Sequence, residues 1–215
     1  MLIIGAKGFA KEVLEILYQM HMLENVAFFD DVSDDLPKKL YGQFDILRNI
    51  DEVKYHFQTF GNQFTLGIGN PVLRKKMCDK FEILGGVLTS TISPKASIGH
   101  FGNEIEEGCN IMTGTTITND VIVGKGCLIN LNCTIGHDCK IRQYVEISPG
   151  VNISGNCDIK EYTSIGTNAT VLPKINVGTN VIIAAGAVVT KNIPNNCLVA
   201  GVPAVIKKEL PQIEF

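Results

Sequence analysis

The residues best suited to chemistry are a histidine and the aspartate that follows it, His137 and Asp138. An exposed imidazole can act as a general base near neutral pH, and a neighbouring carboxylate can raise its basicity or hold its tautomer. Gly155 follows eighteen residues later, and a glycine there would leave a backbone N–H accessible beside the imidazole as an oxyanion donor. A base and a donor in these places favour acyl transfer. The alternative is that His137 is a polar corner residue without a catalytic role.

The other histidines fit catalysis less well. His100 lies in an irregular stretch, and His21 and His56 lie in the N-terminal part of the chain. A metal hydrolase would need about three histidine ligands, and the C-terminal part has only two, without the spacing of a metal site. We therefore expect no metal.

A six-residue repeat determines where His137 and Gly155 lie. Every sixth residue from Ile105 to Val189 is Ile or Val, without an insertion. This period fits neither an α-helix nor a simple strand, and it is typical of a parallel β-helix. The fourth residue after each aliphatic also faces inward and is mostly small. We predict an all-β parallel β-helix with five coils of 18 residues after one less regular coil, with His137 and Gly155 at one corner of successive coils.

Five of the seven cysteines occupy the small inward position of this repeat. A thiol there behaves as a small hydrophobe, so we expect buried structural cysteines that are poor nucleophiles. An odd number of cysteines, with no export signal, fits a reducing cytoplasm rather than a disulfide framework. The five are Cys109, Cys127, Cys133, Cys139 and Cys157.

Residues 1–86 alternate strands with helices, which predicts a small α/β domain with a parallel, Rossmann-like sheet. The expected strands are residues 1–5, 25–29 and 64–69. Asn70 and Pro71 give the N-cap and first-turn signal of a helix that ends at two glycines. Residues 45–57 show no clear pattern.

The glycine turn at residues 5–10, GAKGFA, lies between the first strand and the first helix. Backbone N–H groups and the helix dipole favour a phosphate there, although a tight turn would give the same sequence. Asp30 and Asp31 follow the second strand, where an acidic residue commonly bonds a ribose hydroxyl. The domain is too small for a complete dinucleotide fold, so a mononucleotide or a nucleotide-sugar fits better.

The repeat pattern replaces the α/β pattern at about residue 87. We expect the β-helix over residues 87–205 and a C-terminal tail at residues 206–215. The net charge of −3 and the pI near 5.8 argue against nucleic acid or an anionic membrane as the partner. No apolar run reaches the roughly 18 residues of a transmembrane helix, so we expect no membrane span. With the cysteine pattern, we expect a cytoplasmic protein.

The sequence resembles the left-handed β-helix acyltransferases that use acetyl-CoA. The resemblance is carried by the hexapeptide run, by GTNATVLPKINVGTNVIIAAGAVVTKNIP and by the closing AGVPAVIKK. The N-terminal LIIGAKGFAKEV, FFDD and LGIGNPVLRKK resemble the subfamily with a nucleotide-sugar-binding domain in front. That subfamily includes sialic-acid O-acetyltransferases and bacterial UDP-amino-sugar N-acetyltransferases. The resemblance implies left-handed coiling, acetyl-CoA as co-substrate and a homotrimer.

The resemblance also implies roles for individual residues. His137 matches the catalytic histidine, Asp138 its acidic neighbour, and Asn130 a polar residue near the acceptor amine. The positions that match the coenzyme A site are Gly155, Thr167, Ala185, Gly201 and Pro203. The positions that match the nucleotide-sugar site are Lys7, Gly8, Phe9, Asp30, Asp31, Gly69 and Asn70.

The resemblance, together with His137, implies an acetyl-CoA-dependent N-acetyltransferase that acts on a UDP- or GDP-linked 4-amino-4,6-dideoxy sugar for a bacterial surface or protein glycan. An O-acetyltransferase of a sugar such as sialic acid would use the same base, so it remains an alternative. A trimer that binds a nucleotide-sugar without catalysis is the alternative of a different class.

Overall fold

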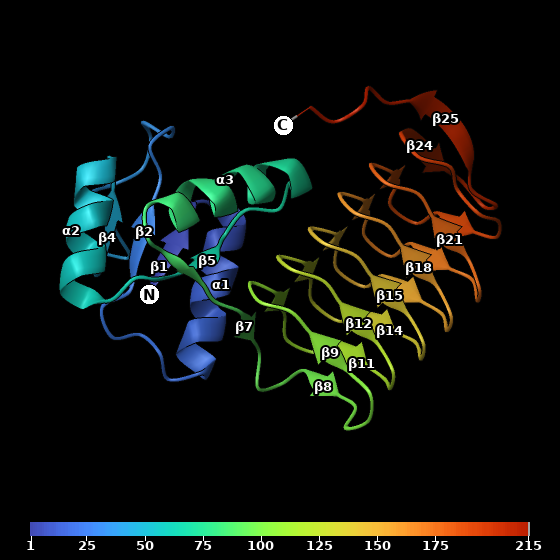
Figure 1. Cartoon of the computed structure of the whole chain (residues 1–215), viewed down its shortest axis with the longest axis horizontal. Coiled ribbons are helices and arrows are strands. Elements are labelled where there is room, and N and C mark those ends of the chain that lie inside the picture. The colour runs from blue at the N-terminus through green and yellow to red at the C-terminus, as the bar shows by residue number, and fades with distance from the viewer. Residues whose placement is uncertain (215) are drawn as a thin grey trace.

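A computed structural model describes residues 1–214, in which an α/β domain is followed by a long left-handed β-helix (Figure 1). The α/β domain contains a six-stranded sheet with the order β3-β4-β2-β1-β5-β6. All neighbouring strands are parallel except β3 and β4. The strands are β1 (Leu2–Ile4), β2 (Ala27–Phe29), β3 (Lys39–Leu40), β4 (Phe44–Leu47), β5 (Gln63–Leu66) and β6 (Val87–Leu88).

Three helices cover the two faces of this sheet: α1 (Gly8–Gln19), α2 (Ile50–Phe60) and α3 (Pro71–Ile83). Helix α1 packs Val13 and Leu17 on the face that carries Ile3. Helices α2 and α3 pack on the opposite face, with residues such as Phe57 and Phe81. The buried central strand β1 is apolar throughout because helices lie on both of its faces.

The β-helix has three sheets, one for each side of a triangular prism, and their strands are parallel except for the last strand of sheet I. Sheet I contains β7 (Thr91–Ile92), β10 (Asn110–Ile111), β13 (Leu128–Ile129), β16 (Glu146–Ile147), β19 (Ser164–Ile165), β22 (Ile182–Ile183), β24 (Cys197–Ala200) and β25 (Val205–Glu209). Sheet II contains β8 (Ser97–Ile98), β11 (Thr116–Ile117), β14 (Thr134–Ile135), β17 (Asn152–Ile153), β20 (Thr170–Val171) and β23 (Val188–Val189). Sheet III contains β9 (Glu104–Ile105), β12 (Ile122–Val123), β15 (Lys140–Ile141), β18 (Asp158–Ile159) and β21 (Asn176–Val177).

The register confirms the predicted coil length. Thr134 pairs with Asn152 and Ile135 with Ile153, so equivalent residues of adjacent coils are eighteen positions apart. The repeated aliphatic residues form one continuous core along the prism. Strands β7 to β23 have two residues each because the chain turns a corner about every six residues.

The inward cysteines are buried, as expected, and each thiol donates to a backbone carbonyl of the next coil. Cys133 Sγ lies 3.2 Å from Ser148 O, and Cys139 Sγ lies 3.1 Å from Ser154 O. Thr115 does the same with its hydroxyl, at 2.6 Å from Asn130 O. Burial raises the pKa of the Cys133 thiol to about 11, which makes it a poor nucleophile.

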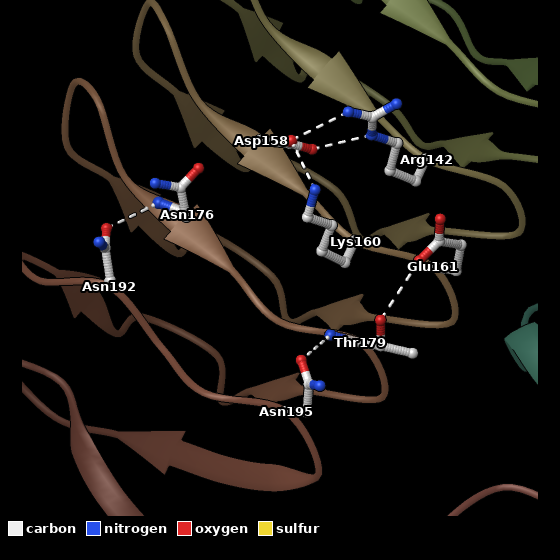
Figure 2. A network of polar contacts seen from close by, with 8 residues as sticks. All are labelled: Arg142, Asp158, Lys160, Glu161, Asn176, Thr179, Asn192 and Asn195. Carbon is white, nitrogen blue, oxygen red and sulfur yellow. Dashed lines mark hydrogen bonds and ion pairs between the residues drawn. The ribbon is translucent and has the colours of Figure 1, made fainter.

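Polar side chains connect the C-terminal coils on the outside of the prism (Figure 2). Asp158 accepts from Arg142 at 2.9 and 3.0 Å and pairs with Lys160 at 2.7 Å. Further along, the side chains of Asn192 and Asn195 accept from backbone N–H groups one coil below, each at 2.9 Å. These contacts hold the coils in register where the chain leaves the hexapeptide repeat.

Two strands lie at or across the predicted domain boundaries. Strand β6 (Val87–Leu88) pairs with β5 in the N-terminal sheet, so the β-helix begins at β7 rather than at residue 87. Residues 206–209 are not a free tail, because β25 pairs antiparallel with β24 and closes the end of the prism. The unassigned segment at residues 45–57 contains most of β4 and the first part of α2.

Candidate active site

His137 lies at the corner between sheets II and III, where the chain turns from β14 to β15. Its Nδ1 is 2.6 Å from Asp138 Oδ2, and both side chains are more than half exposed. A neutral imidazole whose Nδ1–H donates to this carboxylate presents an unprotonated Nε2, which is the form of a general base. Asp138 has a φ of 58°, a left-handed conformation that Asp tolerates better than most residues.

Gly155 lies on the next coil at the same corner, directly against the imidazole. A Cβ on Gly155 would be 2.6 Å from His137 Nε2, so any side chain would displace the ring. The backbone N–H of Gly155 donates to no acceptor within residues 1–214, whereas the next amide, of Asn156, donates to His137 O at 2.8 Å. The imidazole of His137 and an N–H group without an acceptor among residues 1–214 therefore lie on adjacent coils at this corner.

The remaining residues assigned to acetyl transfer lie along a different edge, between sheets I and II. Asn130 follows β13, and Thr167 and Ala185 follow β19 and β22 two and three coils above it. Gly201 and Pro203 continue the edge beyond β24, with a cis Val202–Pro203 peptide bond. Within one chain the full width of sheet II separates this edge from His137.

Asn130 is mostly buried, and its side chain is engaged locally. Its Oδ1 accepts from the backbone N–H of Leu131 at 2.8 Å, and its carbonyl accepts from Thr115. Within the chain it has no contact with His137, so its role beside the acceptor stays a prediction.

The predicted nucleotide residues meet in a cavity of about 420 Å³ at the carboxyl ends of β1, β2 and β5. Six of the seven line it: Lys7, Gly8, Phe9, Asp30, Asp31 and Gly69. Ligands of parallel α/β sheets bind at this end of the strands, next to a helix N-terminus. Helix α1 has no side-chain cap and no acidic residue in its first turn, so its first N–H groups are open to an anion.

Two glycines let the backbone segments meet at this cavity. Gly5 has a φ of 101°, and a Cβ there would lie 2.9 Å from Gly67 O. A Cβ on Gly67 would lie 2.7 Å from the Cβ of Ala10 in helix α1. The glycine turn is therefore required by close packing as well as being suited to phosphate.

The acidic residues of the cavity have local partners. Asp30 Oδ1 accepts from Ser33 N at 2.9 Å and shapes the loop that follows β2. Asp31 pairs with Lys80 at 3.2 Å, and Lys7 pairs with Asp35 at 3.0 Å.

Asn70 does not line the cavity. Its Oδ1 accepts from Leu73 N at 2.9 Å, so its side chain caps helix α3, as the sequence signal indicated. Its expected role in binding the nucleotide-sugar has no support from its position.

Arg48 was not found by sequence reasoning. Its guanidinium donates to the carbonyls of Asp30, Ser33 and Leu36 at 2.8 to 3.0 Å, which fixes the loop that walls the cavity. It lies in the segment without a readable pattern, and its acceptors are backbone groups that no motif reports.

No cluster of three or more His, Cys, Asp or Glu side chains suited to a metal ion occurs within the described chain. Among the same residues, none of the helices combines the length and apolar character that crossing a bilayer requires.

Comparisons with known proteins agree on the domain order. The family model of the PglD N-terminal domain matches residues 1–81. WeeI from Acinetobacter baumannii is 30% identical, with 96% of this chain and 98% of that chain covered and a TM-score of 0.86. A histidine-to-asparagine variant of perosamine N-acetyltransferase from Caulobacter crescentus, in complex with CoA and GDP-perosamine, is 28% identical, with coverages of 97% and 96% and a TM-score of 0.89.

Two further acetyltransferases are similar to this chain. The acetyltransferase domain of PglB from Neisseria gonorrhoeae, in complex with acetyl coenzyme A, is 28% identical, with coverages of 96% and 98% and a TM-score of 0.85. A tetrahydropyridine-dicarboxylate N-acetyltransferase from Staphylococcus aureus is 42% identical over 50 residues, which are 23% of this chain. That match spans only about a fifth (21%) of the Staphylococcus aureus protein.

Proposed function

The chain belongs to the hexapeptide-repeat sugar acetyltransferases with a PglD-type N-terminal domain, and on this basis we propose that it acetylates the amine of a nucleotide-linked amino sugar. The observation that carries the proposal is the corner at which His137 Nε2 faces Gly155, with Nδ1 held by Asp138. The cavity of the α/β domain supplies a place for the nucleotide. Acetyl-CoA is the donor.

The reaction proceeds by direct transfer. His137 Nε2 accepts a proton from the sugar amine as the nitrogen attacks the thioester carbonyl, and Asp138 stabilises the resulting imidazolium. The N–H of Gly155 donates to the oxyanion that develops on the carbonyl oxygen. The C–N bond forms, the C–S bond breaks, and the proton held by His137 passes to the leaving thiolate. No acyl-enzyme is needed, in keeping with cysteines that are all buried in the described chain.

We further propose that the protein is a homotrimer whose acetyl-transfer site is composite. The predicted coenzyme A residues Thr167, Ala185, Gly201 and Pro203 lie one sheet away from His137 within a chain. Two copies packed edge to edge would bring the II–III edge of one prism against the I–II edge of another. Asn130 shares the I–II edge and would then reach the acceptor at the His137 of a neighbouring copy.

The acceptor we favour is a UDP- or GDP-linked 4-amino-4,6-dideoxy sugar. The support is the structural relative that is described as a perosamine N-acetyltransferase in complex with GDP-perosamine, and whose coverage includes both domains. Seven free and buried cysteines fit a reducing compartment, where acetyl-CoA and nucleotide-sugars are both available, so we place the reaction in the cytoplasm.

The test incubates the protein with acetyl-CoA and a panel of UDP- and GDP-amino-sugars, together with free and CMP-linked sialic acid. Products are read by mass spectrometry, because the seven thiols would disturb a thiol-release assay. We expect one acetyl group on an amino-sugar nucleotide, with a loss of about 10²-fold or more in kcat for His137→Ala. Acetylation of a sialic acid hydroxyl instead would replace the acceptor, and undiminished activity of the variant would remove His137 from the mechanism.

A further inference from the structure

Arg74 in helix α3 is fully buried, although its neighbours on the helix surface are lysines. Its guanidinium makes five hydrogen bonds, and every acceptor is uncharged. Nη1 donates to Leu66 O at 3.2 Å and to Ile68 O at 2.7 Å. Nε donates to Gly126 O at 2.8 Å, and Nη2 donates to Cys127 O at 3.3 Å. The fifth acceptor is Asn110 Oδ1, at 2.7 Å from Nη2.

These acceptors belong to both domains. Leu66 ends strand β5, and Ile68 lines the cavity assigned to the nucleotide. Gly126 and Cys127 directly precede β13, on the coil that continues through β14 to His137. One side chain therefore joins the loop of the nucleotide cavity to the coil that carries the catalytic histidine.

A second buried polar group extends the connection. Asn110 on β10 is fully buried and donates from Nδ2 to Thr65 Oγ1 at 3.1 Å and to Thr91 Oγ1 at 2.6 Å. Thr65 lies on β5 and Thr91 on β7, so this network also crosses from the α/β sheet to the β-helix. A buried network with every member bonded fixes one arrangement of its parts.

Arginine is required by this arrangement. Burial lowers the pKa of the guanidinium to about 10, which still leaves it protonated at neutral pH. A planar group with five N–H donors in fixed directions can donate to acceptors of the α/β domain and of the β-helix at the same time. A lysine ammonium has three donors on one atom and can satisfy the carbonyls of one domain but not of both.

We propose that Arg74 is a positioning residue that holds the acceptor cavity in a fixed orientation to its own prism, and so to the imidazole that the bound sugar must reach in the assembly. This inference rests on the proposed function, because the orientation matters only if a sugar bound in the α/β domain must reach an imidazole of the prism. An orientation error of about 1 Å at the reacting atoms can cost on the order of 10²-fold in rate.

The test compares Arg74→Lys and Arg74→Met with Lys76→Met, which makes a similar loss of charge at an exposed position of the same helix. We expect kcat/KM for the nucleotide-sugar to fall by about 10²-fold in Arg74→Met and by about tenfold in Arg74→Lys. The KM for acetyl-CoA should stay within about twofold, because neither His137 nor the I–II edge is touched. Lys76→Met should match the wild type in both.

Hydrogen exchange gives a second readout that does not depend on the reaction. Peptides covering residues 66–69 and 126–129 should both exchange faster in the Arg74 variants than in Lys76→Met, because their carbonyls lose one shared partner. Equal loss of efficiency for both substrates, or unchanged exchange in both peptides, would overturn the positioning role. If the wild type transfers no acetyl group, the proposed function fails by itself, and the exchange comparison still decides whether Arg74 couples the two domains.

Discussion

At the scale of single residues, the candidate site depends on two backbone features: a glycine at position 155 and a left-handed conformation at Asp138. The imidazole of His137 lies against the bare Cα of Gly155, and Asp138 takes a left-handed conformation that turns its carboxylate back to Nδ1. The site therefore depends on backbone geometry at one corner of two successive coils rather than on a cleft. The proposed proton transfer requires that the carboxylate select one tautomer of the imidazole.

Asp138→Asn tests this selection. Asn adopts positive φ as readily as Asp, so the turn should be kept and the melting temperature should stay within a few degrees. The amide can donate to Nδ1, which would favour the tautomer with a protonated Nε2 and stabilise no imidazolium. We expect kcat to fall by about 10²-fold, with little change in the KM for acetyl-CoA. Steady-state kinetics measures both parameters. An unchanged kcat, with a change only in the KM for acetyl-CoA or for the nucleotide-sugar, would contradict the role of Asp138 in proton transfer.

The sequence revealed His137 and not Arg74, for a physical reason. A repeat places residues by arithmetic, so eighteen positions from His137 identifies Gly155 without knowledge of the tertiary structure. Arg74 stands in the run RKK of a helix that reads as solvent-exposed, beside Lys75 and Lys76. Its burial follows from how the two domains meet, and no local pattern encodes that contact.

At the scale of elements, the strands of the β-helix can be predicted from local sequence, whereas several elements of the α/β domain cannot. In the β-helix each strand is dictated by an aliphatic residue and a corner, so it was predictable from residue 105 onward. The short hairpin of β3 and β4 has no such period, and α2 was missed although Asn49 caps it through a 2.9 Å bond from Glu52 N. Strand β6 was misassigned because two residues carry too little pattern to show which sheet they join.

Helix α2 also gives a stability prediction through His56. The side chain is 5% exposed, and its Nε2 has no hydrogen-bond partner among residues 1–214. Burial, with a smaller contribution from the nearby N-terminal ammonium, lowers the pKa of this imidazole to about 4. An unfolded histidine titrates near pH 6.5, so between pH 6.5 and 4 the unfolded chain takes up a proton that the folded chain refuses.

The stability of the folded protein should therefore fall as the pH drops from about 6.5 to about 4, and this contribution should be absent above that window. His56→Phe should remove about 2 kcal/mol of the loss between pH 7.5 and pH 4.5. Urea unfolding at the two pH values measures it. His100→Phe, at an exposed histidine, is the matched control and should keep the wild-type dependence. Parallel pH curves for all three proteins would show that His56 is not the titrating group.

At the scale of the whole molecule, the residues proposed for acetyl transfer lie on two different edges of the prism, which supports the proposed composite site. His137 and Gly155 lie on the II–III edge, whereas Thr167 and Ala185 lie on the I–II edge. In a cyclic oligomer the same two surfaces of each copy meet at every interface, so each interface would contain one edge of each kind. A trimer would then have three equivalent sites.

Mixing two inactive variants tests this assembly. His137→Ala removes the base, and Ala185→Trp places a large ring on the exposed I–II edge. If each site takes its two edges from different copies, random mixed trimers from equal co-expression should regain about a quarter of the wild-type sites. If each chain carries its own site, the mixture should stay inactive. The control is co-expression of the His137→Ala/Ala185→Trp double variant with wild type. If each site is shared between two copies, both must be wild type, and about a quarter of full activity should remain. If each chain carries its own site, about half should remain.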